Sequence, residues 1–172
     1  LLSGRGRGLL SPEPRAPLDR FDLIAFSLPF ENDFPHILRM LAWGGIPLLQ
    51  EDRGESTPLV VGGGITTFLN PAPLAAFFDA FLLGEAEAVL GPFLSTCRRM
   101  LGRGTPRADI LHILAREAPA LYVPSLYRPV YRSNGLLAAT EPRAPDVPER
   151  VTVMRDPADR PPAVSRVTTP ET

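Results

Sequence analysis

Two short apolar runs, each followed by an unusual loop, constrain most strongly what this chain can fold into. The run Leu59 to Val61 leads into Gly62, Gly63 and Gly64, and the run Phe81 to Leu83 leads into Gly84-Glu85-Ala86-Glu87. Continuous apolar runs of this length are typical of strands buried on both faces of a parallel sheet. Ligands of open α/β sheets bind beyond the carboxyl ends of the strands. The two loops are therefore predicted to lie where such a sheet holds its ligand.

Strand and helix patterns alternate along the first two thirds of the chain, which predicts an α/β fold with a mostly parallel sheet flanked by helices. We expect the first strand, Phe21 to Leu28, to be central and buried on both faces because its run is continuously apolar. A helix is expected to begin at Asn70, since asparagine caps helices and Pro71 suits the first helical position. The other expected elements are strands over 58–62 and 79–83 and helices over 34–43, 85–102 and 106–118.

The composition changes after residue 118 and again after residue 140. Residues 121–132 are rich in tyrosine and valine, and Ser133-Asn134-Gly135 is a hairpin turn signal before 136–140. Prolines recur from Glu141 onward, and such a segment does not pack a core. We therefore divide the chain into a flexible lead-in over 1–20, an α/β domain over 21–118, a β-hairpin extension over 119–140 and an extended Pro-rich linker over 141–172. The linker is expected to make few core contacts.

Charge and cysteine content exclude several classes of function. The formal net charge is −1, and the 18 basic residues are scattered, which argues against a nucleic-acid partner. The single cysteine, Cys97, cannot form a disulfide within the chain or hold an iron–sulfur cluster or a cysteine-based zinc site, so no metal site is expected. No apolar run reaches the length of a membrane span and no signal peptide is evident, so a cytoplasmic location is expected.

Each motif also has a plain structural explanation. The glycines could let a flat ligand or a phosphate approach the backbone, or they could form a tight turn. They match neither the dinucleotide fingerprint nor a phosphate-binding P-loop with its lysine. The carboxylates of Glu85 and Glu87 suit a helix amino terminus, and their spacing does not supply two opposed catalytic acids. A hydroxyl at the end of the first strand, Ser27, could bond a ligand. No Ser/His/Asp arrangement stands out, so no catalytic residue is assigned.

A longer series of residues resembles a known family. The series begins with Phe26-Ser27-Leu28 and Gly44-Gly45-Ile46-Pro47-Leu48, and continues with Val60-Val61-Gly62-Gly63-Gly64 and Asn70-Pro71-Ala72-Pro73-Leu74-Ala75. It ends with 77–87 and Tyr122-Val123-Pro124-Ser125-Leu126-Tyr127. Over about residues 18–140 this order resembles the N-terminal cobalamin-binding-like domain of B12-binding radical SAM proteins. The resemblance rests on the combined order, not on a single motif.

The resemblance implies a Rossmann-like, flavodoxin-like domain that binds base-off cobalamin with its nucleotide tail at the carboxyl ends of the strands. The positions that match the family's binding loops are Ser27, Leu28, Gly62, Gly63, Gly64, Gly84, Glu85 and Glu87. It also implies a partner, the protein's own C-terminal radical SAM domain, which would hold a [4Fe–4S] cluster and S-adenosylmethionine. The chain itself would be catalytically inactive, and it would lack the first strand of the complete domain.

Two other functions fit the same residues. The domain could be a degenerate scaffold that binds no cofactor and docks on the radical SAM barrel or on a substrate. Alternatively, it could be a flavodoxin-like module for another nucleotide or flavin. The visible spectrum of the chain after incubation with cobalamin distinguishes among the three hypotheses.

Overall fold

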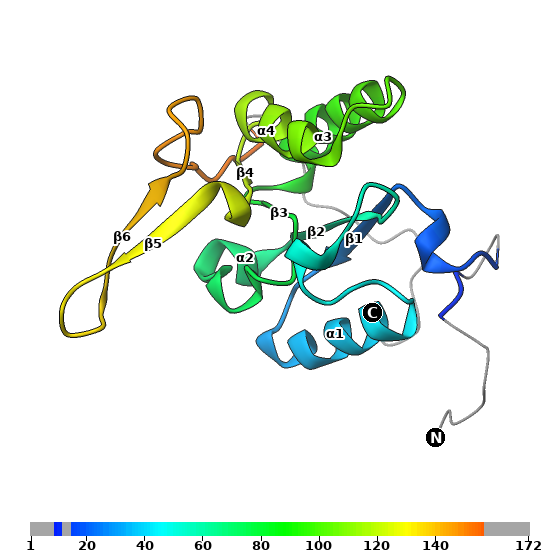
Figure 1. The fold of residues 1–172 in the computed structure, drawn as a ribbon, viewed down its shortest axis with the longest axis horizontal. Helices are drawn as coiled ribbons and strands as arrows, with labels where there is room; N and C mark the ends of the chain where they lie inside the picture. Colours follow the sequence, from blue (N-terminus) through cyan, green and yellow to red (C-terminus); the bar gives the residue numbers. More distant parts are fainter. Residues whose placement is uncertain (1–8, 12–14, 157–172) are drawn as a thin grey trace, which may run out of the picture.

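A four-stranded sheet forms the centre of the fold (Figure 1). The computed structural model describes residues 9–11 and 15–156. The strands lie in the order β1 (Leu23–Ser27), β2 (Leu59–Gly63), β3 (Ala80–Leu82) and β4 (Leu121–Tyr122). The first three run parallel, and β4 pairs antiparallel with β3. The predicted α/β class with a mostly parallel sheet is therefore confirmed.

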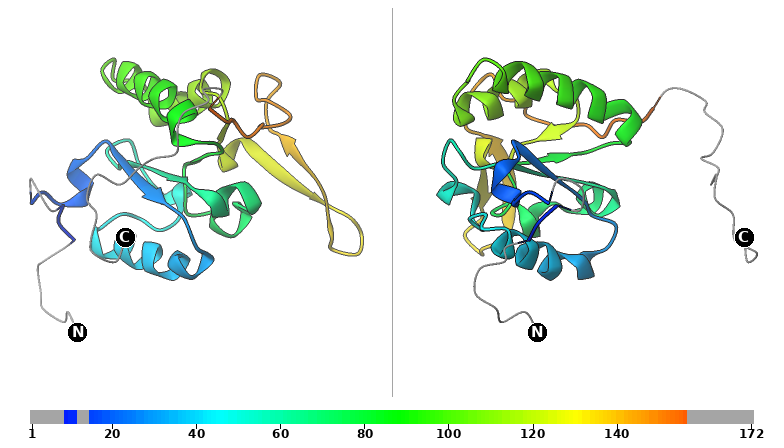
Figure 2. Two further views of the ribbon diagram at one scale, coloured as in Figure 1. Left: turned by 180° about the vertical axis from the view of Figure 1, so that it is seen from behind. Right: turned by 90° about the vertical axis from the view of Figure 1, so that its right-hand side faces the viewer.

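Helices cover both faces of the sheet (Figures 1 and 2). One face packs against α1 (Phe34–Trp43), and the opposite face packs against α3 (Ala86–Leu101) and α4 (Arg107–Glu117). A short helix, α2 (Ile65–Leu69), follows β2 directly. Single turns of 3-10 helix occupy Leu18–Arg20, Glu31–Asp33, Gln50–Asp52, Ala72–Leu74 and Pro124–Leu126. Among the described residues, no helix combines the length and apolar character needed to cross a membrane.

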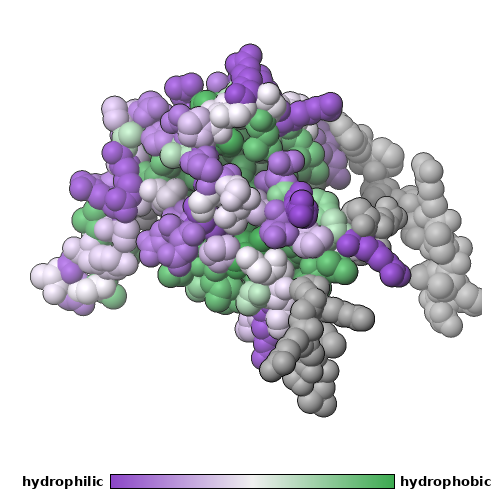
Figure 3. Space-filling view, turned by 45° about the vertical axis from the view of Figure 1, so that its right-hand side comes forward, coloured by the Kyte–Doolittle hydropathy of each residue, from purple (hydrophilic) through white to green (hydrophobic). Residues whose placement is uncertain are grey.

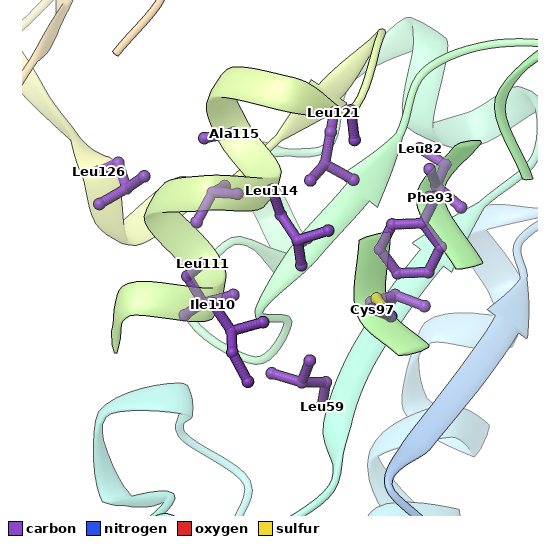
Figure 4. Close-up of a cluster of buried hydrophobic side chains, with 14 of the residues drawn as sticks. Leu59, Leu82, Phe93, Cys97, Ile110, Leu111, Leu114, Ala115, Leu121 and Leu126 are labelled. Carbon is purple, nitrogen blue, oxygen red and sulfur yellow. The ribbon is translucent and has the colours of Figure 1, made fainter. Parts of the chain in front are cut away.

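Two hydrophobic cores lie on the two faces because side chains along a strand alternate. From β2, Leu59 and Val61 join the core under α3 and α4, whereas Val60 joins the core over α1. In the first core, Phe93 of α3 and Leu114 of α4 turn toward the sheet from neighbouring helices (Figure 4). β2 is therefore the buried strand that its sequence predicted.

The position of β1 differs from the prediction of a strand buried on both faces. Within the part of the chain that the structure describes, β1 pairs only with β2 and forms an edge of the sheet. The carbonyl of Asp22 and the N–H of Leu28 form hydrogen bonds with β2. Because the main-chain groups of successive residues in a strand point alternately to its two sides, those of every second residue between Asp22 and Leu28 point to the free edge. These alternate residues are Leu23, Ala25 and Ser27. Because α3 extends over β2 and β3, Ala25 remains exposed.

The prediction that a helix begins at Asn70 is wrong. The helix begins five residues earlier, at Ile65, because Gly64 adopts a φ of +113° that turns the chain sharply out of β2. Asn70 is extended, and its side-chain oxygen accepts the N–H of Ala72 at 3.1 Å. This bond from Asn70 to the residue two positions later forms a local turn, and the segment that follows is a single 3-10 turn, Ala72–Leu74, instead of a longer helix.

A two-stranded hairpin projects from the body of the molecule (Figure 1). Its strands are β5 (Tyr127–Tyr131) and β6 (Leu137–Pro142), which pair antiparallel. The expected hairpin included residues 121 and 122, but these residues pair with β3 at the edge of the main sheet. All residues from 131 to 140 are exposed, so the outer hairpin packs against nothing in the described part of the chain.

The segment after the hairpin contacts the core more than its composition predicts. It has no helix, but Val147 is 4% exposed and joins the core under α4. The hydroxyl of Tyr127 donates to the carbonyl of Pro148 at 2.7 Å. Of residues 143–156, Val147 is buried, and Ala144 and Val151 pack partly against the core. The rest of the expected linker, 157–172, and most of the first half of the expected lead-in lie outside the described residues.

Candidate functional site

A cavity of about 410 Å³ opens at the carboxyl ends of the first three strands. The ends of β1, β2 and β3 form its floor, and the first turns of α3 form one wall. The residues that line it include Ser27, Gly62, Gly63, Gly64 and Gly84, five of the eight positions expected to bind a ligand. The structure thus brings all three predicted loops to one edge of the sheet. Hydrophobic side chains also reach the surface between polar ones on the face in Figure 3.

Strand register explains why these residues meet. Ser27 of β1 lies directly beside Gly63 of β2, and Gly63 lies beside Leu82 of β3. Neighbours in a parallel register share a sheet face, and here that face is the one under α3. The hydroxyl of Ser27, the backbone of Gly63 and the isobutyl group of Leu82 therefore form one row across the floor of the cavity.

The three glycines have different structural roles. A β-carbon on Gly62 would lie 2.8 Å from Leu28 Cδ1, so Gly62 is needed for core packing. A β-carbon on Gly64 would lie 2.9 Å from the Leu28 backbone, and the φ of Gly64 is strained for other residues. A β-carbon on Gly63 would make only ordinary contacts, the nearest at 3.8 Å to Leu82. Gly63 alone leaves open space that a ligand could use.

Leu28 does not line the cavity. Its side chain is 0% exposed and belongs to the core over α1. Its N–H donates to the Gly63 carbonyl at 2.7 Å, and its carbonyl accepts the Thr66 hydroxyl at 2.7 Å. These bonds fasten the loop after β1 to the turn after β2. Leu28 therefore shapes the floor of the cavity without facing it.

The Gly84–Glu87 loop has divided functions. Gly84 lines the cavity. Glu85 Oε2 instead accepts the N–H of Asp156 at 2.8 Å, so this carboxylate bonds to the C-terminal segment. Glu87 is exposed, and no hydrogen bond or ion pair to its side chain occurs within the described residues. Neither carboxylate is therefore committed to the cavity.

The lining of the cavity carries no charged side chain. Apart from the Ser27 hydroxyl, its side chains are apolar, and glycines expose main-chain groups. His36 lies exposed on α1, across the sheet from the cavity, and His112 lies on α4. No group of three or more His, Cys, Asp or Glu side chains among residues 9–11 and 15–156 could hold a metal ion. This environment favours an uncharged, flat ligand group over a cluster of phosphates.

Cys97 is a core thiol on α3. It is 3% exposed, and burial raises its pKa from 9.0 to about 11. We expect native protein at pH 8 to react with iodoacetamide at least tenfold more slowly than protein unfolded in guanidinium, because the thiolate is the reactive form. Mass spectrometry of timed samples measures the difference. Equal rates in the two states would show that the thiol is accessible.

A buried ionic cluster at the opposite end of the strands was missed by the sequence reasoning. Asp79 Oδ2 lies 3.0 Å from Arg53 Nη1 and 2.7 Å from Arg107 Nη2, and it accepts the Val60 N–H at 2.7 Å. Burial lowers the pKa of Arg53, and Asp79 partly offsets that effect. The one signal was an aspartate between apolar residues at a strand start. The cluster joins α4 and the 53–58 loop to the sheet, and its role is structural.

Comparison with known proteins places the chain in a family. The family model described as radical SAM proteins, N-terminal, matches residues 2–124. No curated protein and no solved structure matches the chain. The matched range includes the whole four-stranded sheet and every residue that lines the cavity. The chain therefore belongs to the family of N-terminal domains of radical SAM proteins.

Proposed function

We propose that this chain is the cofactor-binding domain of a cobalamin-dependent radical SAM enzyme and that it binds base-off cobalamin. The observation that carries the proposal is the cavity at the carboxyl ends of β1, β2 and β3, with the open position at Gly63 in its floor. Family membership and the resemblance of residues 18–140 to B12-binding relatives support it. The chain supplies binding and orientation, and catalysis requires the rest of the enzyme.

The residues present fit the flat base at the end of the nucleotide tail of cobalamin. Its flat, uncharged ring would lie over Gly63, where a side chain would otherwise occupy the space. The Ser27 hydroxyl, beside Gly63, would hydrogen-bond a polar atom of the tail. When bound, cobalamin supplies a cobalt centre that can carry a methyl group. Ser27 and Gly63 would hold the tail, and the apolar wall from α3 would exclude water from it.

The iron–sulfur cluster and S-adenosylmethionine belong, in this proposal, to a C-terminal radical SAM domain. The 172 residues contain one cysteine, and that cysteine is buried in the core. A [4Fe–4S] cluster held by thiolates requires several cysteines. The chain therefore cannot hold such a cluster by itself, and its partner in the reaction would be the domain that does.

A scaffold that binds no cofactor is the second candidate. It is favoured by apolar side chains that remain exposed after β1 and β2: Phe30, in the loop after β1, is 68% exposed, and Ile65 and Leu69, at the two ends of α2, are 60% and 73% exposed. Exposed apolar groups that cluster on a surface often mark a contact with another domain. A flavodoxin-like role is less well supported because the matching family model describes radical SAM proteins, and no feature of the cavity favours a flavin over cobalamin.

Replacing Gly63 with leucine tests the proposed site. The new side chain would project into the cavity, and we expect cobalamin to bind at least tenfold more weakly, a loss of about 1.4 kcal/mol. Titration with hydroxocobalamin, followed by the visible spectrum, measures both the affinity and the change to the base-off form. Ser27→Ala should cost less, about 0.5–1.5 kcal/mol, as for one neutral hydrogen bond.

Gly63→Ala is the matched control, because its β-carbon makes only ordinary contacts at 3.8 Å. It should fold like the wild type and bind cobalamin with an affinity between those of the wild type and Gly63→Leu. Circular dichroism should show that all variants are folded. Equal binding by a folded Gly63→Leu variant would show that the site is wrong. If the wild-type chain does not bind cobalamin at all, the scaffold function becomes the better explanation.

A further inference from the structure

The last described residues of the chain lie against the third loop of the cavity. We call residues 151–156 the strap. Met154 forms an isolated parallel bridge with Gly84. The Met154 N–H donates to the Leu83 carbonyl at 2.9 Å, and the Glu85 N–H donates to the Met154 carbonyl at 2.9 Å. The strap therefore extends the sheet by one short pairing at the rim of the cavity.

Two residues of the loop have the properties that this attachment needs. A β-carbon on Gly84 would lie 2.5 Å from the Met154 carbonyl oxygen, so only glycine allows the strap to approach so closely. Glu85 adds a side-chain bond, because its Oε2 accepts the Asp156 N–H at 2.8 Å. Glu85 makes no side-chain bond that caps α3, so its carboxylate serves the strap and not the helix.

The strap is attached by main-chain bonds more than by burial. Val153 and Met154 are 43% and 39% exposed, and only Val151 packs against the core. Elements with few buried contacts and exposed hydrogen bonds open locally without global unfolding. The strap can therefore detach while the sheet stays folded.

The loop that holds the strap also orders the wall of the cavity. The Glu85 carbonyl accepts the N–H groups of Ala88 at 3.0 Å and Val89 at 3.1 Å, which form the first turn of α3. Gly84 and Val89 both line the cavity. Displacement of the loop would therefore move the wall.

We infer that the Gly84–Glu85 loop is the receptor for the strap, and that attachment of the strap sets the order of the cavity wall. The glycine and the first glutamate of the Gly-Glu-x-Glu motif then bind a segment of the same chain instead of a cofactor. The strap is a conformational device with an attached and a released state. The inference does not depend on which ligand the cavity takes.

Amide hydrogen exchange measured by NMR on the 172-residue chain tests the inference. In the wild type, the Met154 and Asp156 amides should be protected, but less than the Val61 amide in the central strand. Glu85→Ala removes one acceptor and should speed exchange at Asp156 about fivefold. Gly84→Ala should speed exchange at Met154 more than tenfold, with Val61 changed less than twofold. Because its β-carbon would also lie 2.8 Å from Val89 Cγ1, the effect of the strap on the wall is measured in Glu85→Ala, where exchange at Val89 should rise at least twofold.

Glu87→Ala is the matched control. It removes the same charge from the same helix terminus, but its side chain makes no hydrogen bond or ion pair with the strap. It should leave exchange at Met154 and Asp156 within twofold of wild type. Unchanged exchange in Glu85→Ala, or an equal increase in Glu87→Ala, would overturn the inference. If Gly84→Ala also loosens Val61, the Glu85 and Glu87 pair decides the question alone.

Discussion

Asp79→Ala is expected to lower the free energy of unfolding by about 3–5 kcal/mol. Asp79 is 1% exposed and contacts both Arg53, 6% exposed, and Arg107, 9% exposed. Removal of the carboxylate leaves two guanidinium groups with no counter-charge in a buried site. It also leaves the Val60 N–H without its side-chain acceptor. Urea unfolding followed by circular dichroism gives the change directly.

The matched control is Asp52→Ala, in the loop that leads to Arg53. Asp52 is exposed, and within the described residues its side chain makes no hydrogen bond or ion pair. Its replacement should change the free energy of unfolding by less than about 0.5 kcal/mol. A small effect of Asp79→Ala, similar to that of the control, would show that water solvates the two arginines. The cluster would then not hold α4 and the 53–58 loop to the sheet.

Phe93→Ala is expected to lower the free energy of unfolding by about 3–5 kcal/mol. The ring is 0% exposed and lies in the core between α3 and the sheet (Figure 4). Truncation removes apolar contacts and leaves a cavity that the surrounding core closes only in part. Because α3 also forms the wall of the candidate site, a folded Phe93→Ala variant should bind ligand more weakly. Thermal and urea unfolding measure the first effect.

Leu94→Ala is the control that tests whether the loss of stability comes from the burial of the side chain or only from removing a large apolar residue from α3. Leu94 is the next residue of the same helix, but its side chain is 43% exposed. Its replacement should cost less than about 1 kcal/mol, because the lost burial is partial and alanine favours the helix. Equal losses in the free energy of unfolding for the two variants would indicate that α3 is rotated about its axis relative to the sheet.

The arrangement of the parallel strands could be predicted from the sequence because the patterns that indicate it lie within short segments of the chain. An apolar run at Leu59 to Val61 ends in glycines, and the carboxyl ends of parallel strands meet at one edge. The meeting of Ser27, Gly63 and Gly84 at one cavity follows from that topology alone. The exposed flank of β1 could not be predicted in this way, because a continuous apolar run does not show whether a neighbour covers it.

Other features depend on contacts between distant residues. The sequence presents Gly62, Gly63 and Gly64 as equivalent, but their roles differ because Leu28 packs against two of them. Arg107 reaches Asp79 across 28 positions, and no local pattern marks such a pair. The strap was missed because proline-rich composition predicts an extended chain, and an extended chain can still pair with a strand end.

Part of the lining of the candidate site, at Gly63 and Gly84, is polypeptide backbone without a side chain, and this has a consequence for mutational scanning. Alanine scanning reports what a side chain contributes beyond its β-carbon. Gly63 and Gly84 have no such side chain, so the scan would add atoms there instead of removing them. A scan of this cavity would therefore give few positions of lost affinity even if a ligand makes most of its contacts with these strands. Amide-to-ester replacement, which alters single main-chain donors, would reveal contacts that alanine scanning overlooks.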